Sequence, residues 1–270
     1  MSDIVLSSSV RSNLLNLQQT SDLIASTQAK LATGKRVNSA LDNPNNYFTA
    51  QGLDNRANDL SNLLDSMSTG INTIQAANNG ISSITKLVQS AQSLVSQAQQ
   101  TSDTTVRASL ASQFDAIRTQ ITQLAGDSGF NGTNLLNGNS LTVTLNESGS
   151  SSTTVTGVTD TAAGLGVNAT TNSWADTTAI SASGTELTAA LATLRSQSQT
   201  LGSNLSTVQI RQDFTKATIN TLQAGSSALT LADSNQEGAN LLALQTRQQL
   251  STTALSLASQ ADQNVLRLFQ

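Results

Sequence analysis

The chain has 270 residues, of which 11% are charged, 3% are aromatic and one is a proline, and its net charge is −4. Its few Lys and Arg residues are scattered, so no positive stripe is available for nucleic-acid phosphates. The absence of cysteine excludes disulfides and thiolate metal sites, and the absence of histidine removes the commonest general base. We therefore expect a non-enzymatic protein with no cofactor or metal. The small aliphatic side chains favour a mainly α-helical bundle.

The first segment predicts an amphipathic helix that ends at Gly34. Its seam residues alternate steps of four and three, the spacing of a coiled coil: Val10, Leu14, Leu17, Ser21, Ile24, Gln28 and Leu31. A glycine readily adopts the left-handed conformation of a helix C-terminus. Pro44 and the neighbouring Asn and Asp residues then predict a non-helical connector that extends to Asn46.

Two further helices are predicted before the middle of the chain. The first begins at about Tyr47 and carries one apolar stripe: Leu60, Leu64, Met67, Ile71, Ile74, Ile81, Ile84, Val88, Ala91, Val95 and Ala98. The second follows an N-cap at Asp103 and stops at Gly126. Its stripe is Val106, Leu110, Phe114, Ile117, Ile121 and Leu124.

Residues 130–182 have a different character. Residues 141–145 and 153–158 alternate with period two and are joined by residues 147–150, which predicts a β-hairpin. The Thr- and Ser-rich remainder around Trp174 is interpreted as an exposed loop or a small cap. It contains a Gly-x-Gly-x-x-Ala match at residues 164–169, but without a preceding strand and a following helix we interpret this match as a loop.

Residues 187–229 carry an unbroken seam that needs a facing helix to bury it. Its positions are Leu187, Leu191, Leu194, Ser198, Leu201, Leu205, Val208, Gln212, Thr215, Ile219, Leu222, Ser226 and Leu229. We expect this helix to pack against residues 60–98 and 106–124. Polar residues at seam positions fix the register of facing helices at some cost in stability, and here they include Ser198, Gln212 and Thr215.

A break at residues 233–235 precedes a last amphipathic helix. Its seam is Ala243, Arg247, Leu250, Ala254, Leu257, Ala261, Asn264 and Leu268. The seams of the first and last helices are expected to pair with each other and to need further chains for completion. The candidate assembly residues are Val10, Leu14, Leu17, Ile24, Leu31, Leu250, Ala254, Leu257, Ala261, Val265 and Leu268.

Residues 1–11 lack the basic and apolar regions of a cleaved signal peptide, and no apolar stretch reaches the roughly 20 residues of a membrane span. We therefore expect no membrane insertion. A cytoplasmic location and export without a cleaved signal both remain open at this point.

Four segments together resemble bacterial flagellins. The first, residues 30–42, has the sequence Lys-Leu-Ala-Thr-Gly-Lys-Arg-Val-Asn-Ser-Ala-Leu-Asp. The others are residues 130–136, residues 201–214 with Val-Gln-Ile-Arg-Gln-Asp-Phe, and residues 263–269 with Gln-Asn-Val-Leu-Arg-Leu-Phe. The residues that carry this signature are Gly34, Arg36, Asn38, Ser39, Arg211 and Asn264. The middle region is short, so the chain resembles a short form of the family.

The resemblance implies an inner coiled-coil domain made of residues 1–42 and 233–270 and a connector at 43–56. It further implies a helical rod with the hairpin at 57–182 and a return helix at 183–232. It implies a secreted structural subunit that polymerises with itself into the extracellular flagellar filament for swimming. The implied partners are the export apparatus, an export chaperone, and junction and cap proteins. A hook–filament junction protein and a helical adaptor module are the alternatives.

Overall fold

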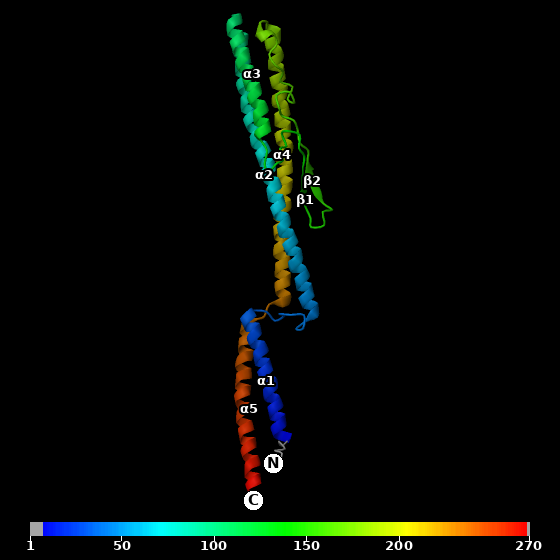
Figure 1. The fold of residues 1–270 in the computed structure, drawn as a ribbon, viewed down its shortest axis with the longest axis vertical. Coiled ribbons are helices and arrows are strands. Elements are labelled where there is room, and N and C mark those ends of the chain that lie inside the picture. Colours follow the sequence, from blue (N-terminus) through cyan, green and yellow to red (C-terminus); the bar gives the residue numbers. More distant parts are fainter. Residues whose placement is uncertain (1–7, 269–270) are drawn as a thin grey trace. The chain divides into compact units, whose positions relative to one another are not determined.

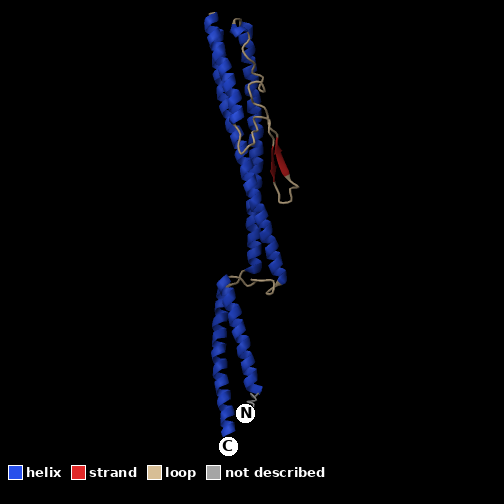
Figure 2. Ribbon diagram, viewed as in Figure 1, coloured by secondary structure: helices blue, strands red, loops and turns tan. Residues whose placement is uncertain are grey.

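The computed structural model describes residues 8–268, leaving aside the side chains of Ser9, Asp262 and 265–268. Its elements in chain order are α1 (Ser8–Thr33), α2 (Pro44–Gln100), α3 (Thr104–Asp127), β1 (Leu141–Thr144), β2 (Ser152–Val155), a short 3₁₀ helix η1 (Asn172–Trp174), α4 (Thr177–Thr230) and α5 (Ser234–Leu268). The fold is mainly α with one small sheet, as predicted (Figure 2).

The chain divides into two compact units, each described separately below. We call residues 1–55 together with 221–270 the terminal unit, and residues 56–220 the central unit. The domain ranges implied by the sequence stay a prediction.

In the central unit, α2 and α4 lie side by side and run in opposite directions (Figure 1). Ser198 Oγ donates to Asn78 Oδ1 at 2.8 Å, and Gln212 Nε2 donates to Ser68 Oγ at 2.9 Å. The polar residues predicted to set register therefore bond across the helix pair. Every predicted seam position of residues 187–219 in α4 is buried or half-buried, which confirms the seam in this unit.

The predicted apolar stripe of α2 is also buried, apart from Leu64, which is half-buried. On α3, Phe114 and Ile121 are fully buried as predicted, but Val106 is 45% exposed. The neighbouring Arg107 is buried instead, because its guanidinium donates to the carbonyl oxygens of Ala98, Thr101 and Ala175. Asp103 caps α3, as predicted, by accepting from the backbone N–H groups of residues 105 and 106.

Two predicted helix starts are wrong. α2 begins at Pro44 rather than near Tyr47, so residues 44–56 of the expected connector are helical. Proline fits the first turn of a helix, where its missing N–H would have no partner, and Asn43 Oδ1 accepts from Asn46 N at 3.0 Å. α4 begins at Thr177 rather than near residue 183, because Asp176 Oδ1 accepts from Ala179 N at 2.8 Å.

The predicted hairpin is confirmed, with a shorter second strand. β1 and β2 pair antiparallel, with Leu141 opposite Val155 and Thr144 opposite Ser152. After Val155 the chain leaves the ladder and pairs instead with residues 135–138, since Val158 N donates to Leu135 O at 2.7 Å. The hairpin lies close to α2 because Gly70 has no side chain: a Cβ there would lie 2.6 Å from Val143 Cγ2.

The segment after the hairpin is not an exposed loop. Trp174 is fully buried, its ring centroid lies 5.0 Å from that of Phe114, and its Nε1 donates to Ser183 Oγ. Leu165 and Val167 are also buried. Of the two interpretations of this region, burial favours the small cap. The Gly-x-Gly-x-x-Ala match lies in turns, as expected of a loop.

Candidate assembly surface on the terminal helices

In the terminal unit, α1 and α5 lie side by side as predicted (Figure 1). Near one end of the pair, Lys30 Nζ lies 3.8 Å from Glu237 Oε1. An ion pair this exposed contributes little stability, so apolar contact between the helices must supply most of it.

One face of each helix is covered by the other helix. The covered positions on α1 are Val10, Leu17, Thr20, Ile24, Thr27 and Leu31. The covered positions on α5 are Glu237, Leu241, Leu244, Gln248, Ser251, Leu255 and Ala258. Both sets follow the steps of four and three that define a seam. α1 and α5 therefore form a two-stranded antiparallel pair with a partly polar interface.

The predicted seam of α5 faces away from α1. Leu250 is 67% exposed and Leu257 is 62% exposed, and Ala254 and Ala261 are exposed as well. The prediction that this seam meets the seam of α1 is therefore wrong. The seam that does so is shifted by one residue, which is about 100° around a helix. α5 thus carries two stripes, one covered by α1 and one left open.

On α1 the predicted residues are mostly covered, but Leu14 is 42% exposed. Sequence reasoning missed three further exposed leucines, Leu15, Leu23 and Leu242. Their signal was available, because each is an apolar residue outside the assigned seam. The side chains of Val265 and Leu268 lie outside the described residues.

The signature residues of the connector join it to the end of α4 within the terminal unit. Gly34 has φ +67°, the left-handed conformation expected at the end of α1. Ala232 N donates to Gly34 O at 3.0 Å and Arg36 N donates to Thr230 O at 2.7 Å, which ties the two connecting segments together. Arg36 Nη2 also donates to Ala228 O at 3.1 Å, where a positive charge complements the C-terminal end of the helix dipole.

Asn38 and Ser39 shape the turn that follows. Asp42 Oδ2 accepts from the backbone N–H groups of both residues, each at 2.9 Å, and from Ser39 Oγ at 3.3 Å. The bonds from the backbone of Asn38 and then of Ser39 lower the pKa of the Asp42 carboxyl below its ordinary value. Asn38 Nδ2 donates to Lys35 O at 3.1 Å. These bonds fix the path of the connector between α1 and α2.

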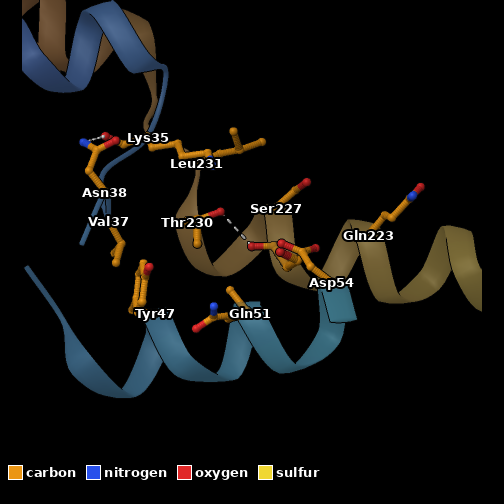
Figure 3. Close-up of a pocket in the computed structure, with 12 residues that line it drawn as sticks. Lys35, Val37, Asn38, Tyr47, Gln51, Asp54, Gln223, Ser227, Thr230 and Leu231 are labelled. Carbon is orange, nitrogen blue, oxygen red and sulfur yellow. Dashed lines mark hydrogen bonds between the residues drawn. The ribbon is translucent and has the colours of Figure 1, made fainter. Parts of the chain in front are cut away.

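The connector borders a pocket of about 530 Å³ (Figure 3). Its lining comes from the connector, the start of α2 and the end of α4: Lys35, Val37, Asn38, Tyr47, Ala50, Gln51, Asp54, Gln223, Ser226, Ser227, Thr230 and Leu231. Lys35 and Asp54 are the charged members of this lining. The other two signature residues are not part of this cluster: Arg211 is exposed on α4 in the central unit, and Asn264 is exposed on α5.

Among the described residues, no helix has both the length and the apolar character that crossing a membrane requires.

Comparison with known proteins identifies the family. The bacterial flagellin N-terminal helical region matches residues 5–141, and the bacterial flagellin C-terminal helical region matches residues 185–269. Flagellin FljM of Caulobacter vibrioides is 32% identical over 262 residues, which cover 95% of this chain and 94% of that protein. A flagellin of Brucella melitensis is 29% identical and is aligned over the whole of both chains.

A crystal structure of Bacillus cereus flagellin has a TM-score of 0.47 and 23% identity, covering 57% of this chain and 88% of that one. Two family regions in the expected order and relatives of nearly equal length support one conclusion. The chain belongs to the bacterial flagellin family, the structural subunits of the flagellar filament.

Proposed function

We propose that this chain polymerises into the extracellular flagellar filament through the open faces of α1 and α5. The observation that carries the proposal is the exposure of Leu250 and Leu257 on a helix whose opposite face is already covered by α1. Burying a leucine side chain stabilises a complex by about 1.5–3 kcal/mol, so a stripe of leucines is a strong drive to associate. The occupant of the stripe is another copy of the chain.

The contact is heterologous. The open stripe of α5 and the exposed leucines of α1 differ in sequence, so one surface binds a different surface on the next copy. When such a rotation does not close, a helical assembly grows without limit. The partly polar α1–α5 interface supports this order of events, because a weak pair stays adaptable until neighbouring copies cover its outer faces.

The role is structural rather than catalytic. The chain has no histidine or cysteine, and its signature residues serve to hold the connector. The remaining partners follow from the proposed route: an export apparatus and chaperone before assembly, and junction and cap proteins at the filament ends. The signature residues Arg211 and Asn264, both exposed, are proposed to meet neighbouring copies in the filament.

The proposal is tested by seeded polymerisation. Purified protein is mixed with sheared filament fragments, and growth is measured by sedimentation and electron microscopy. For the double variant Leu250→Ser, Leu257→Ser we expect a rise in critical concentration of at least about tenfold, since about 1.4 kcal/mol corresponds to tenfold in affinity. Its circular dichroism should match that of the wild-type monomer, because both leucines are exposed there.

The control is Val106→Ser, which alters an exposed apolar residue of the central unit and should polymerise at nearly the wild-type concentration. Growth of the double variant at wild-type concentration would contradict the proposal. A second variant that lacks residues 255–270 should stay a soluble, helical monomer. Wild-type particles that never elongate seeds would favour a junction protein or an adaptor instead.

A further inference from the structure

The central unit contains a carboxyl group that no other residue satisfies. Asp160 is 0% exposed, and neither of its carboxylate oxygens has a hydrogen-bond partner among the described residues. Its backbone N–H donates to Leu136 O at 2.9 Å, which fixes its position at the end of the paired segments 135–138 and 158–160. Burying an ionised carboxylate without a partner is far more costly than burying the neutral acid.

The side chain that acts on this carboxyl is Gln197 of α4, whose Oε1 is also buried and without a partner in the described chain. Gln197 forms part of the wall of a pocket of about 400 Å³ together with Leu135, Val158 and Leu201. Two groups of acceptor atoms thus occur together without a donor. Each unsatisfied buried acceptor costs about 1–3 kcal/mol, so one added proton would relieve both residues.

No cation compensates Asp160. On α3, Arg118 donates to Val167 O at 2.9 Å and to Asp115 Oδ1 at 3.3 Å. Arg107, the buried cation of α3, is committed to three backbone carbonyl oxygens. On α4, Arg195 is exposed, and Glu186 accepts from the backbone and side chain of Asn168. Asp160 takes part in none of the ion pairs found among the described residues.

We propose that Asp160 is protonated in the folded protein and that its hydroxyl group donates to Gln197 Oε1. This acid–amide pair is a latch that joins the segment after the hairpin to α4. When the proton is lost, a bare carboxylate faces an amide oxygen inside the protein, and the segment loosens from the helix. The pocket beside Gln197 offers water a route to the pair. This inference concerns the central unit alone and does not depend on polymerisation.

The direction of the pH dependence follows from proton linkage. Burial raises the pKa of the Asp160 carboxyl above its ordinary value, and the Gln197 side chain opposes that rise only in part. Between the ordinary value and the raised one, the folded state holds a proton that the unfolded state has released. Stability is therefore fully present below the ordinary pKa and falls as the pH rises through the raised pKa.

The test compares the wild-type monomer with Asp160→Asn, whose amide N–H can donate to Gln197 at any pH. Urea unfolding is followed by the emission of Trp174, the single tryptophan, which is buried in the same unit. At about pH 8 the variant should be more stable, by about tenfold in the folding constant for each pH unit by which the wild-type pKa is raised. The gap should close near about pH 4.

Asp59→Asn is the matched control, because Asp59 is exposed in the same unit and its variant should follow the wild-type curve. Gln197→Met removes the proposed acceptor while nearly keeping its size, so its destabilising effect should be larger at low pH than at high pH. Parallel curves for wild type and Asp160→Asn would overturn the proposal. A larger effect of Gln197→Met at high pH would also overturn it, because the amide would then be donating to the ionised carboxylate.

Discussion

The two units of this flagellin differ in how completely they cover their own apolar residues. The central unit buries Phe114, Met67 and Trp174 entirely, and its helices are braced by a hairpin and a cap. The α1–α5 pair of the terminal unit covers Leu17 and Leu244 only in part and leaves Leu250 more than half exposed. The same spacing of apolar residues therefore serves two purposes, an internal core in one unit and an external contact in the other.

The difference lies in the number of helix faces. In the central unit, α2, α3 and α4 surround a shared core, so one stripe per helix suffices. In the α1–α5 pair each helix meets one other helix, and a second apolar stripe on α5 has nothing to cover it within the chain. The central unit should consequently fold in the monomer, whereas the terminal helices should be completed only by assembly.

The largest expected effect is the loss of the central core. Phe114→Ala should destabilise the central unit by about 3–5 kcal/mol, because it leaves a cavity beside Trp174 and Ile121. Urea unfolding followed by circular dichroism measures this change. Phe214→Ala is the matched control: this phenylalanine is 62% exposed on α4, so its loss should leave monomer stability nearly unchanged. Similar losses in the two variants would erase the distinction between core and surface.

A smaller effect is expected for a polar residue in the central seam. Ser198→Ala removes the donor to Asn78 Oδ1 and should cost about 1 kcal/mol in the free energy of unfolding. Ser206→Ala, at an exposed position of the same helix, should cost much less. If Ser198→Ala were as mild as its control, the bond between α2 and α4 would contribute nothing to their register.

The smallest expected effect concerns the connector of the terminal unit. The lowered pKa of Asp42 means that its bonds to Asn38 and Ser39 support the turn above the ordinary carboxyl pKa and are lost as the pH falls through the lowered value. Exchange of the amide protons of residues 38 and 39, measured by NMR, should speed up at that acid pH. Asp42→Asn should exchange fast already at neutral pH, while Asp22→Asn on α1 should not. Unchanged protection in Asp42→Asn would remove Asp42 from the account.

The helices of the central unit were predictable because local pattern and tertiary packing agree. Steps of four and three mark the seam of α4, and the same residues are buried in the structure. Helix ends were less predictable, because a cap such as Asp176 or Asn43 is one polar residue among many in a chain rich in Asn, Ser and Thr. Trp174 was misjudged because its neighbours are polar, and its partner Phe114 lies 60 residues away in sequence.

The face of α5 that meets α1 could not be read from spacing. The two stripes differ by one residue, and both satisfy the same periodicity. Only contact with α1 distinguishes Leu244 and Leu255 from Leu250 and Leu257. The signature residues of the connector were named from resemblance, but their bonds to the end of α4 come from the fold, since Arg36 and Ala228 lie 192 residues apart.

Hydrogen exchange on the monomer and on the filament tests the central claim most directly. We predict that amides of α5 in the monomer exchange at least about a hundredfold faster than those of α2 near Ile74 and Ile84, which are fully buried. In the filament, α5 should become as protected as α2. If α5 were already as protected as α2 in the monomer, or stayed unprotected in the filament, the claim that assembly completes the terminal helices would be contradicted.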